Sequence, residues 1–136
     1  MREKIRQRIR TIKIWQLTEA VGLTPEQSER FFPVYNKHRE TIHNLESEKQ
    51  EALRRLSSLT DDPDASDDDI NKAMTKIDDF VRRSMEMRQE YMNEISSVLS
   101  LRQQGKLLVF EENFQRKLQE IIRDIRRDFR GRRMRD

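Results

Sequence analysis

Aspartates and histidines are the side chains of this sequence whose types and spacing could do chemistry, and the aspartates form the denser cluster. Carboxylates at high density can bind Ca²⁺, but an EF-hand loop also needs a central glycine and a closing glutamate, and this run has neither. Aspartates are equally expected in a loop and in the first turn of a helix, where they complement the helix dipole. We therefore assign no metal to the run. Its members are Asp61, Asp62, Asp64, Asp67, Asp68 and Asp69.

The two histidines, His38 and His43, are the candidate ligands for a transition metal. They are five residues apart, which on one helix separates them by about 140° around the axis, so one chain cannot bring both to the same ion. A metal site would need His43 together with Glu46, or histidines from two chains. We predict no metal site and no cofactor.

The sequence lacks the signatures of catalysis. It has no glycine-rich phosphate loop, no nucleophile elbow, no cysteine and no Ser/His/Asp set with supporting context. An enzyme would also need a pocket, which a sparse helical core rarely provides. We predict that the protein is not an enzyme and has no catalytic residues.

Two stretches share one helix-start pattern, in which a leucine precedes a capping residue and a glutamine follows three positions after the cap. In the first stretch, Thr24 can accept a hydrogen bond from a first-turn amide, and Gln27 can reach back to the Thr24 amide to complete a capping box. Pro25 suits the first helical position, where its missing N–H costs nothing. Ser100 and Gln103 repeat the pattern. The preceding leucines are Leu23 and Leu99.

Apolar periodicity predicts four helices, over residues 2–21, 25–59, 67–98 and 101–129, and no strand. The second and third helices space their apolar residues in alternating steps of four and three, a heptad pattern typical of paired helices. Pro33 lies inside the second helix and predicts a bend. The expected fold is therefore all-α, about four helices forming a long bent hairpin.

The apolar seams, meaning the rows of residues expected to face a partner helix, can be read from this spacing. For the second helix the predicted seam is Phe31, Tyr35, His38, Ile42, Leu45, Lys49, Ala52, Leu56 and Leu59. For the third helix it is Ile70, Met74, Ile77, Val81, Ser84, Arg88, Tyr91, Ile95 and Val98, flanked by Ala73, Phe80 and Met87. For the fourth helix it is Leu107, Phe110, Phe114, Leu118, Ile121, Ile125 and Phe129.

Composition limits the size of the core. Of 136 residues, 34% are hydrophobic and 39% are charged, a balance that suits thin helices sharing narrow seams. The net charge of +3 is uneven, with six bases and one acid in residues 1–13 and nine bases and four acids in residues 116–136. Basic ends around an acidic middle favour antiparallel or head-to-tail association between chains. We expect the basic tail, residues 130–136, to be disordered.

The two motif stretches resemble a known family. A Leu-Thr-x-x-Gln motif that returns about eighty residues later on a small, highly charged helical chain is similar to the pattern of the Spy/CpxP family of periplasmic proteins. The segments 31–35 and 107–114, which follow the two motifs, also resemble members of that family. The resemblance covers roughly residues 10–129. Ser100 stands where the family usually has threonine, and both residue types are good caps.

The resemblance implies a fold and a function. It implies one helical domain, residues 1–136, that associates as a cradle-shaped antiparallel homodimer. It implies a periplasmic ATP-independent chaperone whose partners are unfolded proteins or an envelope signalling protein, or alternatively a zinc or nickel sensor or resistance protein of the same fold. Because the family is exported, we expect that a signal peptide or anchor was removed ahead of Met1. The sequence itself has no membrane span.

The first helix is the predicted client-binding element. It has more apolar surface than one seam needs, since Ile14 and Trp15 lie outside the narrowest stripe, and it has the densest basic charge. Unfolded clients are usually net acidic, so they would be attracted to it. The predicted client-binding residues are Ile5, Arg6, Ile9, Arg10, Ile12 and Lys13.

A second alternative is a basic helical protein that binds nucleic acid or a membrane surface. Arginine-rich ends are the electrostatic footprint of nucleic-acid binding, and residues 2–17 form a basic amphipathic segment. However, acids and apolar residues interrupt the bases, and no base-stacking or groove-reading module is visible. We therefore predict no nucleic-acid partner.

Overall fold

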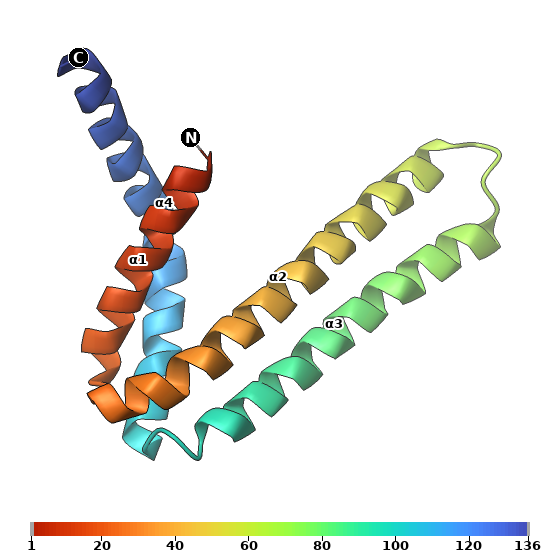
Figure 1. Cartoon of the computed structure of the whole chain (residues 1–136). Helices are drawn as coiled ribbons and strands as arrows, with labels where there is room; N and C mark the ends of the chain where they lie inside the picture. Colours follow the sequence, from red (N-terminus) through yellow and green to blue (C-terminus); the bar gives the residue numbers. More distant parts are fainter. Residues whose placement is uncertain (1, 136) are drawn as a thin grey trace. The chain divides into compact units, whose positions relative to one another are not determined.

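The computed structural model describes residues 2–135 and shows an all-α protein (Figure 1). Helix α1 spans Arg2–Val21, α2 spans Pro25–Asp61, α3 spans Asp67–Ile95 and α4 spans Leu101–Arg135. No strand occurs between residues 2 and 135, as the sequence predicts. The all-α class and the four helices are therefore confirmed.

The helices pack in two pairs, which belong to two compact units. One unit joins the residues up to Ser28 with those from Leu99 onward, and the other spans Glu29–Val98. In the first unit α1 runs antiparallel to α4, because Arg8 contacts Asp128 while Lys13 contacts Glu111. In the second unit α2 and α3 form an antiparallel hairpin (Figure 1).

The seam predicted for α2 is confirmed. Phe31, Tyr35, Leu45 and Ala52 are buried, and the other predicted seam residues are half-buried. Leu45 and Ala52 form a core cluster with Phe80 of α3, and Ile77 and Met87 pack against that cluster. The seam predicted for α4 is confirmed as well, since every residue in it is buried or half-buried.

The seam predicted for α3 is wrong at three positions, Met74, Val81 and Arg88, which are exposed, and its other six residues are buried or half-buried. Met74 and Val81 are 51% and 44% exposed, whereas Phe80 is only 5% exposed. In their place α3 buries, fully or in part, Ala73, Phe80 and Met87, which were predicted to flank the seam and which each lie one position earlier. Both rows have the same heptad spacing, so spacing alone cannot choose between them. The larger apolar area of a phenylalanine ring favours the row that buries Phe80.

Two helix ends also differ from the prediction. Helix α3 ends at Ile95 rather than near Val98, and the chain turns tightly there, with the Val98 amide donating to the Ile95 carbonyl at 2.9 Å. Helix α4 continues past Phe129 to Arg135, so residues 130–135 are helical where we expected disorder, and residue 136 lies outside the described residues. Arginine is a good helix former, and its charge is favourable near a helix C-terminus.

The corrected seam gives a stability prediction. Changing Phe80 to alanine should lower the free energy of unfolding by about 3 kcal/mol, because it removes a buried ring from a thin core. Changing the neighbouring Val81 to alanine should alter it by less than about 0.5 kcal/mol, because that side chain faces solvent. Denaturant unfolding of the two variants checks this. A larger loss of unfolding free energy for Val81→Ala than for Phe80→Ala would show that Val81 faces the partner helix, as predicted from the sequence.

Candidate functional site: coupled helix caps and an adjoining groove

The first helix start is a complete capping box. The Gln27 amide N–H donates to Thr24 Oγ1 at 3.1 Å, and the Thr24 amide donates to Gln27 Oε1 at 3.1 Å. The bonds satisfy two amides that the helix itself leaves unpaired. Gly22, just before this box, has a φ of 72° and ends α1 in the left-handed conformation that favours glycine. The capping roles predicted for Thr24 and Gln27 are confirmed.

The second helix start has the same geometry. The Gln103 amide donates to Ser100 Oγ at 3.2 Å, and the Ser100 amide donates to Gln103 Oε1 at 3.0 Å. Serine therefore serves at this cap in the same way as threonine does at the first. Leu99, which precedes the cap, is 4% exposed and so anchors the chain as it enters α4.

A pair of glutamine side chains joins the two capping boxes. Gln27 Nε2 donates to Gln103 Oε1 at 2.8 Å, and Gln103 Nε2 donates to Gln27 Oε1 at 2.9 Å. Gln103 Nε2 also donates to the Gly22 carbonyl at 3.2 Å. Each amide oxygen thus accepts one bond from its own cap and one from the other box. This bridge fixes the start of α4 against the turn between α1 and α2.

Both capping boxes could be predicted from the sequence, but the bridge between them was not predicted. A signal for it was present, because both third-position residues are glutamine. Glutamate closes a capping box equally well, but an ionised carboxylate cannot donate a hydrogen bond. Two glutamines can donate and accept at the same time, so the amide pair is a chemical reason for glutamine at both positions.

Further along the helix pair from the caps, an ion pair joins α1 to α4. Lys13 is only 5% exposed, and its ammonium lies 3.0 Å from Glu111 Oε2 and 5.1 Å from the centre of the Phe114 ring. A buried ammonium needs such an anion and ring face to offset its lost hydration. Lys13 therefore helps to set the spacing of the two helices.

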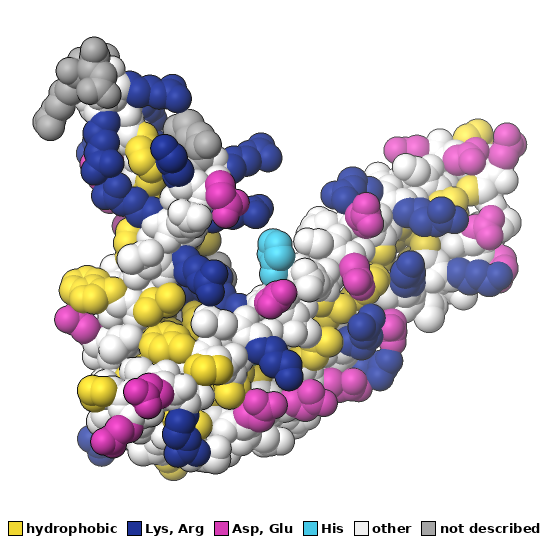
Figure 2. Space-filling view, in the orientation of Figure 1, with side chains coloured by type: hydrophobic (Ala, Val, Ile, Leu, Met, Phe, Trp, Pro, Cys, Tyr) yellow, Lys and Arg dark blue, Asp and Glu magenta, His cyan; other side chains and the backbone are white. Residues whose placement is uncertain are grey.

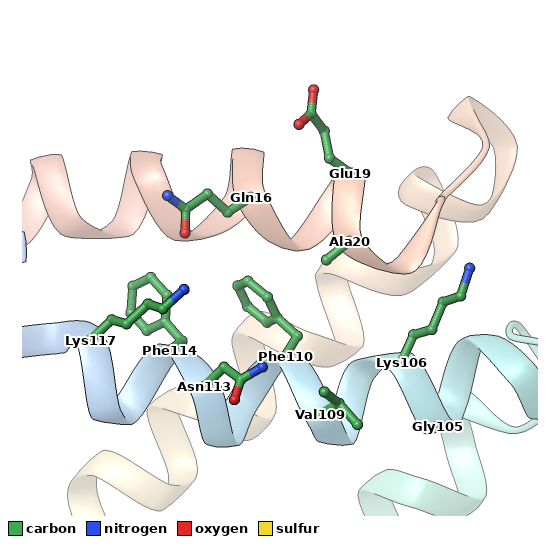
Figure 3. A pocket seen from close by; sticks show the side chains of 10 residues that line it. All are labelled: Gln16, Glu19, Ala20, Gly105, Lys106, Val109, Phe110, Asn113, Phe114 and Lys117. Carbon is green, nitrogen blue, oxygen red and sulfur yellow. The ribbon is translucent and has the colours of Figure 1, made fainter.

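An open groove of about 880 Å³ runs along one side of the α1·α4 pair (Figure 3). Its apolar surface comes from Ala20 of α1 and from Val109, Phe110 and Phe114 of α4, and Val109 is 62% exposed. In Figure 3 the Phe110 ring and the Lys106 side chain extend from α4 toward α1. The polar lining residues are Gln16, Glu19, Lys106, Asn113 and Lys117, with Gly105 completing the wall.

This groove can hold a short apolar segment without enclosing it. The exposed apolar side chains offer contact area, and the two lysines offer positive charge at its edge.

The predicted client-binding residues do not line the groove. Ile5 and Lys13 are buried, Ile9 and Ile12 are half-buried, and only Arg6 and Arg10 are exposed. The expectation that α1 has apolar surface beyond its seam is supported by Trp15, which is 62% exposed. The groove could not be predicted from the sequence, because it brings Val109 and Lys106 of α4 beside Ala20 of α1. That arrangement depends on how the two helices pack.

The histidines lie in the second unit. The His38 ring stacks on Tyr91, with centroids 4.1 Å apart and planes 6° from parallel, so His38 is a seam residue of the α2·α3 hairpin. His43 is exposed. Across the residues that the structure describes, no group of three or more histidine, aspartate or glutamate side chains is arranged to hold a metal ion.

Comparisons with known protein families, with curated proteins and with solved structures find no match in any of the three. The family resemblance therefore rests on the motif residues themselves. Over residues 2–135, no helix is both long enough and apolar enough to cross a membrane.

The caps give a second prediction. Changing Thr24 or Ser100 to alanine should each lower the free energy of unfolding by about 1 kcal/mol, because each change leaves a first-turn amide unpaired. The control is Thr11→Ala on α1, whose hydroxyl donates only to the Gln7 carbonyl within the same exposed turn, and which should cost less than about 0.5 kcal/mol. Cap variants as stable as the control would show that the motif does not act through capping.

Proposed function

We propose that the protein is a periplasmic, ATP-independent chaperone-like protein of the Spy/CpxP class that binds unfolded or stress-signalling protein partners. The observation that supports this most is the groove between α1 and α4, whose exposed apolar side chains lie beside Lys106 and Lys117. Its position next to the two coupled motif boxes gives those motifs a function, since they hold the two helices that form it.

Weak, unselective holding is the mode of binding that such a surface supports. An open groove leaves much of a bound segment in water, so it gains only part of the free energy available from apolar burial. Lysines at the edge attract the acidic residues of a client over about 10 Å at moderate salt and so increase the rate of encounter. Fast association with modest affinity lets a client leave and refold without ATP.

The proposed assembly is an antiparallel homodimer with a cradle shape, as in the family that the motifs resemble. Exposed apolar residues on the hairpin unit, among them Met85 at 69% exposure and Met74 at 51%, are available for contacts between subunits or with clients. Methionine is well suited to both because its flexible side chain adapts to different neighbours.

An aggregation assay with an unfolded model client tests the function. The wild-type protein should slow aggregation without ATP, and Val109→Asp should reduce that protection several-fold, because it places an anion on the apolar surface beside the lysines. The matched control is Leu101→Asp, which places the same charge at an apolar residue of α4 that is 84% exposed and does not line the groove.

Comparing the two variants distinguishes a role of the groove in client binding from a general effect of adding a negative charge to the surface. Both should keep the helical content and melting temperature of the wild type, because both positions face solvent. Equal loss of protection in both variants would contradict a role for the groove, and absence of any protection by the wild type would contradict the chaperone function itself.

A further inference from the structure

The antiparallel pairing of α1 and α4 brings the two arginine-rich segments of the chain to one end of one helix pair. Residues 2–10 contain five bases and one acid, and residues 123–133 contain six bases and two acids. Arg8 and Asp128 lie 3.4 Å apart, which places the segments side by side. We call these two segments together the basic end, and its net charge is +8. Figure 2 shows dark blue side chains concentrated over this end of the helix pair.

This arrangement differs from what the charge pattern of the sequence favours. The pattern suggests basic ends that meet acidic regions of another chain, whereas the fold concentrates both basic ends in the same place. Within the described residues, Arg8–Asp128 is the ion pair that links the two segments, and both side chains remain well exposed, at 38% and 57%. Unneutralised like charges at this density repel one another, so the end gains stability from an external polyanion.

The side chains of the basic end indicate the kind of anion. Ten of its eleven bases are arginine, whose planar guanidinium binds phosphate through two parallel hydrogen bonds. Proteins that bind single-stranded nucleic acid add aromatic side chains on which bases stack, and the one aromatic residue here, Phe129, is half-buried. Phosphate recognition without a stacking platform fits the headgroups of a phospholipid surface.

A tryptophan on α1 supports the same partner. Trp15 follows the basic segment and is 62% exposed, with no buried role in the pair. Tryptophan is enriched at the headgroup level of membranes, where its ring meets both apolar and polar groups. The apolar stripe of α1, which includes Ile5 and Leu17, is already buried, so this helix is not free to lie in the membrane by its apolar face.

We propose that the basic end of the α1·α4 pair docks on an anionic phospholipid surface. The contact is peripheral and electrostatic, with Trp15 at its margin. It would hold the protein near a membrane while the groove stays available for clients, and it does not depend on what the groove binds.

Co-sedimentation with phospholipid vesicles tests this proposal. The protein should bind vesicles containing about a third phosphatidylglycerol and not pure phosphatidylcholine, and binding should fall steeply as salt rises. The triple variant Arg6→Gln/Arg10→Gln/Arg130→Gln should weaken binding on the order of 100-fold, since each base near an anionic membrane contributes about fivefold in partitioning.

The matched control removes the same charge elsewhere. Arg54→Gln/Arg55→Gln/Lys76→Gln changes three exposed bases of the hairpin unit and should leave vesicle binding within about threefold of wild type, because those residues lie outside the docking surface. Equal loss in both triple variants, or binding to neutral vesicles at the same level, would overturn the proposal. Binding to duplex DNA that is tighter than vesicle binding and lost in the first variant would also overturn it and assign the basic end to nucleic acid.

Discussion

Two primary amides, those of Gln27 and Gln103, hold together the starts of two helices that are distant in the chain. Each amide closes its own capping box and also bonds to the other, so neither box can shift without breaking bonds in both. Because a protein with so little apolar sequence cannot rely on a large core, directional polar contacts at the helix ends determine how α1 and α4 meet. The groove depends on this packing geometry, because residues of both helices line it.

Further along the α1·α4 pair from the caps, a polar contact again lies between the two helices. Leu17, Val21 and Leu107 are fully buried beside the boxes, and Lys13 with Glu111 fills the next layer with a charge pair. The Lys13 ammonium is buried and the Glu111 carboxylate is half-buried, so the pair adds little stability, but it gives the ammonium the anion that it needs there. Outside this interior, the arginine-rich segments of α1 and α4 form the basic end.

The fold class, the helix starts and most seams could be predicted from the sequence because they depend on local rules. Thr24 and Ser100 are caps whatever lies around them, and four-three spacing defines a stripe. The α3 seam could be predicted only in part, because the row through Phe80 and the row through Val81 have the same period and only the partner helix distinguishes them. The glutamine bridge, the groove and the basic end could not be predicted either, since each joins residues of α1 or α2 to residues of α4. The motif resemblance predicts a class of protein but does not indicate which surface would bind a partner.

The most direct test of the coupled caps is a double-mutant cycle on Gln27→Ala and Gln103→Ala, measured by denaturant unfolding. Either change alone removes both shared amide bonds as well as one cap bond, and Gln103→Ala also removes the bond to the Gly22 carbonyl, so the second change has no shared bonds left to remove. The double variant should therefore be more stable than the sum of the single costs predicts, by about 1 kcal/mol. Additive costs, within about 0.3 kcal/mol, would show that the two boxes act independently and would contradict this account.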